Sequence, residues 1–468
     1  FMDIKYLNGK KIGITAFDLE QKEHRGIAAV NKSLIQLLCK NGAEIYLITS
    51  LGAKRAKIYE VPFIKKKLLE EIYISDILSS LQEGVNYRGI FQTNHVYRIK
   101  LLIVLFFNTI KLFFTGFKLN YKIFKLSKYH KLTNIFDNRL EYVKDISGLV
   151  VSKNIFHLCR MSSMRILPKT PILPIKKSQL DLIITSSPLS IRSNSKKYTN
   201  IIQLIHDAIP IQLSSHHENP IYFYNRLKDS HKYSSCVYVS NESKRAVRDI
   251  LEIKDKQDNP NDILYPLPSL SLELLNEAKN IKNLRSINKP FILFNSSIVD
   301  RKRVEKTITY FKRSNLVDNN FLLCIAGKLH KSKYCEYIKD ICKDNKNILL
   351  LDYVNELEKG WLFLNASLLI STSTVEGFGV PILDALSINL PCLASNLPTF
   401  KEIKAFTKNN NLTLVKQNQD LIWIKNLNKV KEFNLEDFDK KSERIDNFNK
   451  FINKLESQIL FKINSYLD

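Results

Sequence analysis

Ser371-Thr-Ser-Thr-Val-Glu-Gly-Phe-Gly-Val-Pro-Ile-Leu-Asp-Ala-Leu386 follows an apolar run at residues 366–370. An apolar run that ends in Ser and Thr, a loop with two glycines and then Pro381 before a Leu and Ala pattern predict a strand, a tight loop and a helix. Gly377 and Gly379 let the backbone approach a ligand closely, and a helix tolerates proline in its first turn. The loop amides and the helix dipole therefore predict an anion-binding site at the start of this helix.

Two carboxylates flank the predicted anion site. Glu376 lies at the mouth of the loop, and Asp384 lies about one turn into the helix. A bound diphosphate would repel a carboxylate, so these side chains are better suited to accept hydrogen bonds from hydroxyl groups. A ligand with phosphates in its middle and hydroxyl-rich rings at both ends is a nucleotide-sugar, and the pattern predicts that the site binds one.

The pattern Glu-Gly-Phe-Gly-x-Pro-x-x-Asp-Ala resembles the Glu-x7-Glu signature of retaining glycosyltransferases of family 4, with Asp384 in place of the second Glu. The resemblance implies the GT-B fold, in which two Rossmann-like, doubly wound α/β domains face a cleft and a C-terminal helix crosses back to the first domain. It further implies that Glu376 positions the donor sugar, that Asp384 holds the ribose and that the configuration is retained.

A basic loop follows the strand expected at Phe291–Phe294. Two or three adjacent cations there could neutralise a diphosphate, although basic triplets are also common on the solvated faces of so basic a chain. The family has a similar strand and loop whose lysine holds the donor phosphates, and Lys302 occupies that position with Arg301 before it. The resemblance implies that both offset charge on the departing diphosphate.

His206 directly follows the strand expected at Asn200–Ile205, where doubly wound sheets place ligand contacts. A lone histidine is more often structural, but the strand-end position and the following Asp207 favour a functional role. The family has a similar His-Asp-Leu motif. The resemblance therefore implies that His206 contacts the donor sugar next to the reacting carbon.

Gly26 lies at the first strand-to-helix turn, between a strand at Lys11–Ala16 and a helix with apolar residues from Ile27 onward. One glycine at such a turn is weak evidence, and a purely structural role is equally open. In the family, the equivalent glycine loop closes over the donor phosphates and the acceptor. Val354 precedes a segment, 355–361, that resembles the family's nucleotide-edging segment. The predicted donor-binding residues are Gly26, Ser297, Val354, Gly377, Phe378, Gly379 and Asp384.

With 468 residues the chain can bury two sizeable cores. We expect an acceptor domain at 1–283, a nucleotide-sugar-binding domain at 284–445 and the crossing helix at 446–468. The cysteines are scattered and form no Cys-x-x-Cys, which indicates neither a disulfide framework nor a zinc site. This cysteine pattern favours a reducing cytoplasm, and the start of the sequence shows no signal-peptide pattern, so we expect a cytoplasmic location that includes the inner face of the membrane.

The formal charge of +25 favours an anionic partner, although a genome rich in Lys, Asn and Ile codons would raise the lysine content everywhere. The charge is concentrated within a long insertion at 52–150, where residues 91–136 contain no Asp or Glu. On a helical wheel, five lysines of this insertion fall within roughly 60° of one another. They are Lys100, Lys111, Lys118, Lys122 and Lys125.

Apolar residues, among them the run at 101–107, fill the rest of this wheel, while Lys111 interrupts any span long enough to cross a membrane. The pattern predicts a helix lying in the plane of an anionic membrane at its inner face, with Lys111, Lys118, Lys122 and Lys125 in contact with membrane or acceptor. A buried helix with a solvated basic edge is the open alternative. Nucleic acid is not an expected partner, because so much Leu and Phe is unusual for a phosphate platform.

No strand precedes the one Asp-x-Asp pair, Asp437 and Asp439, which therefore indicates a solvated helix face rather than a metal site. We expect no essential metal and no cofactor beyond the nucleotide-sugar co-substrate. The predicted function is transfer of a hexose from a GDP- or UDP-hexose, of mannose type, to a glycan or lipid-linked glycan in cell-surface polysaccharide or glycolipid assembly. Two alternatives stay open: a non-catalytic basic scaffold with a decayed site that binds membrane or nucleic acid, and a nucleotide-sugar epimerase on the same fold.

Overall fold

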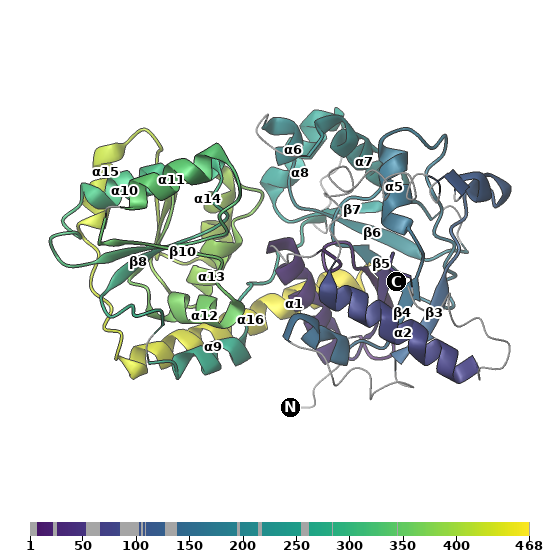
Figure 1. The fold of residues 1–468 in the computed structure, drawn as a ribbon, viewed down its shortest axis with the longest axis horizontal. Helices are drawn as coiled ribbons and strands as arrows, with labels where there is room; N and C mark the ends of the chain where they lie inside the picture. The colour runs from purple at the N-terminus through teal and green to yellow at the C-terminus, as the bar shows by residue number, and fades with distance from the viewer. Residues whose placement is uncertain are drawn as a thin grey trace. The chain divides into compact units, whose positions relative to one another are not determined.

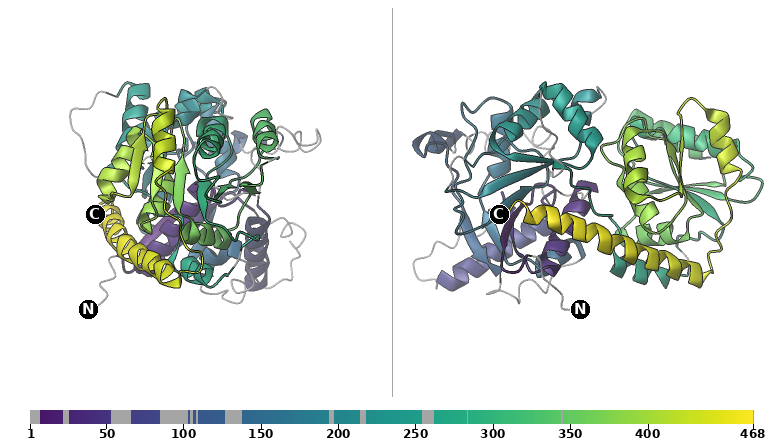
Figure 2. Two further views of the ribbon diagram at one scale, coloured as in Figure 1. Left: turned by 90° about the vertical axis from the view of Figure 1, so that its left-hand side faces the viewer. Right: turned by 180° about the vertical axis from the view of Figure 1, so that it is seen from behind.

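The computed structural model describes residues 7–21, 26–52, 66–84, 103, 106–107, 109–126, 138–193, 197–213, 218–253, 262–282, 284–343 and 345–467. The chain divides into two compact units. The first unit comprises Phe1–Val239, Ser243–Tyr265 and Gln458–Asp468, and the second comprises Ser240–Glu242 and Pro266–Ser457. In each unit, helices lie on both faces of a central sheet (Figure 1, Figure 2).

The first unit contains a seven-stranded sheet in the order β3-β4-β2-β1-β5-β6-β7, in which only the β3–β4 pair is antiparallel. Its strands are β1 (Lys11–Thr15), β2 (Glu44–Thr49), β3 (Lys122–Lys125), β4 (Gly148–Val151), β5 (Leu182–Thr185), β6 (Asn200–Ile205) and β7 (Ser235–Tyr238). Its described helices include α1 (Gly26–Lys40), α2 (Lys66–Glu83), the 3-10 helix η3 (Asn138–Lys144), α5 (Ile155–Ser163), α6 (Ile209–Gln212), α7 (Pro220–Tyr233) and α8 (Asn241–Leu251). The central strands are apolar and buried along almost their whole length, as expected for parallel strands that helices cover on both faces.

The second unit contains a six-stranded parallel sheet in the order β10-β9-β8-β11-β12-β13. Its strands are β8 (Phe291–Asn295), β9 (Leu322–Ala326), β10 (Ile348–Asp352), β11 (Leu368–Ser371), β12 (Cys392–Ser395) and β13 (Leu412–Val415). Its helices are α9 (Leu272–Lys279), the 3-10 helix η5 (Asp300–Lys302), α10 (Val304–Lys312), α11 (Lys333–Lys343), α12 (Glu356–Asn365), α13 (Val380–Ser387), α14 (Pro398–Thr407) and α15 (Asp420–Leu427).

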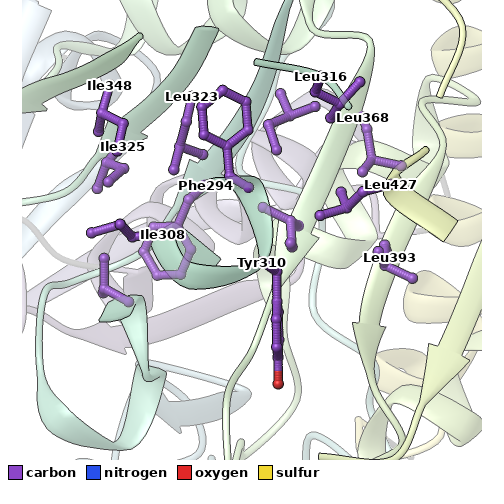
Figure 3. Close-up of a cluster of buried hydrophobic side chains, with 14 of the residues drawn as sticks. Phe294, Ile308, Tyr310, Leu316, Leu323, Ile325, Ile348, Leu368, Leu393 and Leu427 are labelled. Atoms are coloured by element: carbon purple, nitrogen blue, oxygen red, sulfur yellow. The ribbon is translucent and has the colours of Figure 1, made fainter. Parts of the chain in front are cut away.

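The core of the second unit joins the sheet to the helices on one face. Phe294 from β8, Leu323 from β9 and Ile308 from α10 lie together in this core (Figure 3). Tyr310 stacks on Trp423 of α15, with 5.3 Å between the ring centroids. Close packing of this kind holds the loops at the strand ends in fixed positions.

The doubly wound α/β fold class is confirmed, but the units divide at other residues than those expected. The second unit begins at Pro266 rather than at 284, because α9 packs against α12 within that unit. Trp361 Nε1 donates a hydrogen bond to the carbonyl of Ile281, 2.9 Å away. The last helix, α16 (Phe438–Asn464), begins before the expected residue 446, and its residues from Gln458 onward belong to the first unit.

The predicted single helix with a lysine stripe is wrong. Helical structure continues through residue 114, and Gly116 and Phe117 then take positive φ angles of 61° and 65°, which an α-helix does not allow. Lys122 and Lys125 lie on β3, while Lys100 falls outside the described residues. The segment 52–150 is also more than an insertion, because it supplies strands β3 and β4 of the sheet. Within the described part of the chain, no helix is long and apolar enough to cross a membrane.

Candidate functional site

Two loops of the second unit lie at the point where the order of the parallel strands in its sheet reverses. The chain proceeds from β8 outward to β9 and β10, and then returns to place β11, β12 and β13 on the other side of β8. In open α/β sheets, ligands bind beyond the carboxyl ends of the strands at such a reversal. Arg301 and Lys302 follow β8, and Glu376 follows β11. The two loops predicted from the sequence therefore lie side by side.

Hydrogen bonds join these two loops. The backbone N–H of Thr374 donates to the carbonyl of Arg301 over 2.8 Å. The hydroxyl of Thr372 lies 3.0 Å from the carbonyl of Lys302 and 2.9 Å from that of Arg303. Because these hydrogen bonds join the two loops, they fix the positions of Arg301 and Lys302 relative to Glu376.

Glu376 lies between two cations. Lys302 Nζ pairs with Glu376 Oε1, and Arg301 Nη1 lies 3.4 Å from Oε2. Ser373 Oγ donates a further hydrogen bond of 2.8 Å to Oε1. The Lys302 and Glu376 side chains are only 7% and 11% exposed. The cluster carries two positive charges and one negative charge, and its net positive charge suits an anionic ligand.

The pKa of Glu376 reflects two opposing effects. Burial by itself would raise it, but the charges of Lys302 and Arg301, together with hydrogen bonds from Lys302 and Ser373, outweigh burial and hold the pKa below its ordinary value. Glu376 is therefore a carboxylate at neutral pH, able to accept hydrogen bonds and unable to donate them.

The loop at 377–379 leads into α13 as predicted. Gly379 has φ of 110°, and a Cβ at this position would lie 2.5 Å from Phe400 Cε1, so the backbone requires glycine. Pro381 lies in the first turn of α13. The ring of Phe378 is buried, so among the predicted donor contacts this residue offers its backbone rather than its side chain. Ser297 is exposed in the loop after β8, and Val354 is half-buried after β10.

Asp384 is fully buried and already has partners from the chain itself. Ser269 donates to it through its backbone N–H (2.6 Å to Oδ1) and through its hydroxyl (2.5 Å to Oδ2). Lys359 Nζ lies 3.3 Å from Oδ2 and also bonds Ser269 Oγ. This arrangement favours a role for Asp384 in holding Ser269 and Lys359. The predicted contact with ribose stays a prediction, and no sequence pattern pointed to Ser269 or Lys359.

The first unit has a second polar cluster at its own sheet reversal, between β1 and β5. Asp18 follows β1, and its Oδ2 accepts a 2.6 Å hydrogen bond from the hydroxyl of Ser186, which follows β5. His206 follows β6, and its Nε2 lies 2.7 Å from the carbonyl of Ser186. Because a carbonyl only accepts, Nε2 carries a hydrogen. Sequence reasoning found His206 but missed Asp18 and Ser186, although all three are polar residues just after strands.

Burial raises the pKa of Asp18, while the hydrogen bond from Ser186 and the charges of His206 and Arg226 oppose the rise and Glu218 adds to it. Arg226 forms an ion pair with Glu218. Asp18 is only half-buried, and its Oδ1 has no hydrogen-bond partner among the described residues. The oxygen that remains open could accept a hydrogen bond from a ligand hydroxyl.

Two other predicted residues have different surroundings. Asp207 accepts a 3.0 Å hydrogen bond from the backbone N–H of Ile209, and this Asx turn just before the short helix α6 gives Asp207 a structural role. Gly26 is the first residue of α1, and a Cβ there would meet no atom within 4 Å. Packing therefore does not require glycine at position 26, and its predicted contact with the donor stays a prediction.

No group of three or more His, Cys, Asp or Glu side chains that could hold a metal ion occurs in the described ranges. The Asp437 carboxylate accepts a 3.0 Å hydrogen bond from the backbone N–H of Lys440 at the start of α16. Asp437 therefore caps a helix, which agrees with the solvated helix face expected for this pair.

Two sequence comparisons show what this chain is similar to. Residues 276–449 match the family described as glycosyl transferases group 1. A stretch of 116 residues is 28% identical to the serotype-specific mannosyltransferase WbdA of Escherichia coli; it makes up 24% of this chain and spans only 14% of that protein. The matched residues 276–449 lie within the second unit, which spans Pro266–Ser457.

Two solved structures resemble almost the whole chain. Sucrose-phosphate synthase from Thermosynechococcus elongatus superposes with a TM-score of 0.53 at 11% identity, covering 97% of this chain and 98% of that one. A variant of S. aureus TarM superposes with a TM-score of 0.51 at 12% identity, covering 98% and 100%. These likenesses identify the two-unit architecture as the GT-B fold.

Proposed function

We propose that this chain is a retaining glycosyltransferase of family 4 that transfers a hexose from a GDP- or UDP-hexose to a glycan or lipid-linked glycan acceptor. The observation that carries the proposal is the cluster of Lys302, Arg301 and Glu376 at the sheet reversal, beside the start of α13. It combines cations for a diphosphate with a carboxylate for sugar hydroxyls. The mannosyltransferase likeness supports a mannose-type sugar, and the TarM structure contains UDP.

In the proposed reaction, the bond between the anomeric carbon and the diphosphate oxygen breaks. The acceptor oxygen bonds to the same face of that carbon, and its proton passes to a phosphate oxygen. Lys302, Arg301 and the amides of 377–379 stabilise the negative charge that grows on the leaving diphosphate. Glu376 positions the donor sugar through its hydroxyls, and the site needs no metal ion for these steps. The product would extend a cell-surface polysaccharide or glycolipid.

The ion pair between Lys302 and Glu376 suits the site before donor binds. Each group satisfies the other while both are largely buried, which avoids the cost of an unpaired buried charge. When a diphosphate arrives, Lys302 and Arg301 turn to it, and Glu376 is released to accept hydrogen bonds from the sugar. Donor binding therefore exchanges partners within the cluster rather than exposing a new charge.

Nucleotide binding tests the proposal directly. We expect GDP or UDP to raise the melting temperature of the chain and ADP and dTDP to leave it unchanged, because a ligand that binds only the folded state stabilises it. Product formed only when donor and acceptor are both present supports transfer. Conversion of the nucleotide-sugar alone, followed by NMR, would indicate the epimerase. Salt-sensitive membrane or nucleic-acid binding without nucleotide affinity would indicate the scaffold.

In the first unit, we propose that Asp18 accepts a hydrogen bond from the acceptor's hydroxyl, while His206, held by Ser186, orients the sugar. Asp18→Asn is expected to lower kcat/KM for the acceptor by roughly 10- to 100-fold, because a hydrogen bond to a charged group is lost. The donor KM should not change. Asp181→Asn is the matched control, since Asp181 lies at the opposite end of β5 and bonds only the backbone of Lys11 in the described structure.

The same variant has a pH signature. The pKa of Asp18 is raised above its ordinary value of 3.8, so ionisation of Asp18 costs stability as pH rises through the folded-state pKa. Asp18→Asn should therefore unfold at higher urea than the parent at neutral pH, and the gain should vanish below the ordinary pKa. An unchanged acceptor KM together with this stability gain would leave Asp18 a structural residue only.

A further inference from the structure

Exposed apolar side chains are concentrated in one short segment of the first unit. Phe114 is 87% exposed, and Phe106 and Phe107 are each 63% exposed. The exposed apolar residues of this segment, called here the 103–114 face, are Ile103, Phe106, Phe107, Ile110, Phe113 and Phe114. So many exposed aromatic rings in a dozen residues are unusual on a soluble surface and mark a contact site.

The six residues share one side of the helix. At 100° per residue they span an arc of about 120°, and Leu112 lies on the opposite side. Leu112 is 4% exposed and belongs to a buried cluster that includes Phe117 and Leu119. Phe113 also reaches this cluster at its edge, because its ring lies 5.1 Å from the ring of Phe117. The other apolar side chains of the 103–114 face point outward, whereas an ordinary surface helix turns its apolar side inward.

The C-terminal end of this helix is fixed to the body of the first unit. The backbone N–H of Phe117 donates to the carbonyl of Leu112 over 2.7 Å and ends the helix. Phe117 and Leu119 then bond Ile172 through two backbone hydrogen bonds of 2.8 Å. Backbone hydrogen bonds therefore hold the end of the helix that carries the 103–114 face against the body of the first unit.

Basic side chains border the 103–114 face. Lys111 lies about 40° beyond Phe107 on the wheel, and Lys118 follows the helix end. Both lysines are exposed, and neither forms an ion pair within the described ranges. Acidic residues are absent from 91–136. The charged side chains that this segment itself supplies are therefore all basic.

We propose that the 103–114 face docks on an anionic lipid bilayer, with the helix in the interfacial plane, the phenyl rings at the boundary of headgroups and acyl chains, and Lys111 and Lys118 against lipid phosphates. A second copy of the chain is a poorer occupant, because a two-fold contact through this face would bring lysines together. The inference goes beyond the proposed function, since docking requires neither donor nor acceptor.

Vesicle flotation without substrates tests this surface. The parent chain is expected to float with vesicles of phosphatidylcholine and phosphatidylglycerol and to stay at the bottom with phosphatidylcholine alone. Phe106→Ser and Phe114→Ser should each weaken the apparent vesicle affinity by roughly tenfold, because each removes one inserted ring. Phe461→Ser is the matched control: Phe461 is 72% exposed on α16, and its loss should leave flotation unchanged.

Charge-reversal variants test how the lysines beside the 103–114 face contribute to vesicle affinity. Lys111→Glu and Lys118→Glu should each lower affinity at low salt by at least about fivefold, and Lys401→Glu, at an exposed position on α14, should not. A chain that never floats, or variants of the 103–114 face that float like the parent, would overturn the proposal. Vesicle-independent self-association that Phe114→Ser abolishes would also overturn it, in favour of a second copy.

Discussion

Lys302→Ala is expected to lower kcat by roughly 10²- to 10³-fold, with a smaller change in donor KM, because this cation acts most strongly on charge that develops in the transition state. Lys302 lies in the loop after β8, pairs with Glu376 and is 7% exposed. The measurement is steady-state kinetics with saturating acceptor. Removing the ammonium should also raise the pKa of Glu376, since it takes away the largest effect that opposes burial there.

Lys306→Ala provides the control for this variant. Lys306 lies in the first turn of α10, is partly exposed and pairs with Asp420 over 3.3 Å, away from Glu376. Its loss should change kcat little, as for most exposed ion pairs. If Lys302→Ala keeps the parent kcat, the cation does not stabilise the leaving group, and the proposed chemistry of the cluster fails.

Asp384→Ala is expected to lower the free energy of unfolding by about 3–5 kcal/mol, because it leaves the ammonium of Lys359 and two donors of Ser269 without their buried acceptor. The urea midpoint measures this loss. Asp318→Ala, at an exposed position in the same unit, should change stability by less than about 0.5 kcal/mol.

A role of Asp384 in ribose binding would give a different result from a role in structural support. If Asp384 holds ribose, as the family resemblance implies, Asp384→Ala should raise the donor KM with a smaller effect on kcat and leave the urea midpoint nearly unchanged. A large loss of stability accompanied by normal donor binding in the surviving folded protein assigns Asp384 to the support of Ser269 and Lys359. The two results cannot be confused, since one is read by unfolding and the other by kinetics.

Local sequence signals were sufficient for much of the fold. The strand predicted at Asn200–Ile205 is β6 with the same bounds, and the helix predicted after the Gly-Phe-Gly loop is α13, with Pro381 in its first turn. Apolar runs, glycine turns and helix-start residues depend only on a few neighbouring residues, so they can be recognised without knowing the rest of the structure. The basic loop and Glu376 were found in the same way, from residues just after apolar runs.

A helical wheel failed at the lysine segment because it assumes one unbroken helix. The positive φ angles at Gly116 and Phe117 end the helix, and β3 then forms through pairing with β4, more than twenty residues later in the chain. Non-local strand pairing of this kind overrides the local helical pattern. The segment is nevertheless basic and apolar, as predicted. In the structure the exposed apolar side chains lie on one side of the helix that ends at residue 114, and Lys111 lies at their border.

The sequence by itself determined the α/β class, the resemblance to family 4 and the residue types of the donor site, because each depends on neighbours in the chain. Only the tertiary structure decided which side chains meet. Lys302 and Glu376 are 74 residues apart, Ser269 and Asp384 115 apart, and Asp18 and Ser186 168 apart. Contacts over such separations arise from strand order, which places the ends of distant strands together. For the stretch from Ser371 to Leu386, this is why Glu376 pairs with the cations of the distant basic loop and Asp384 with Ser269 and Lys359, which no local pattern predicted.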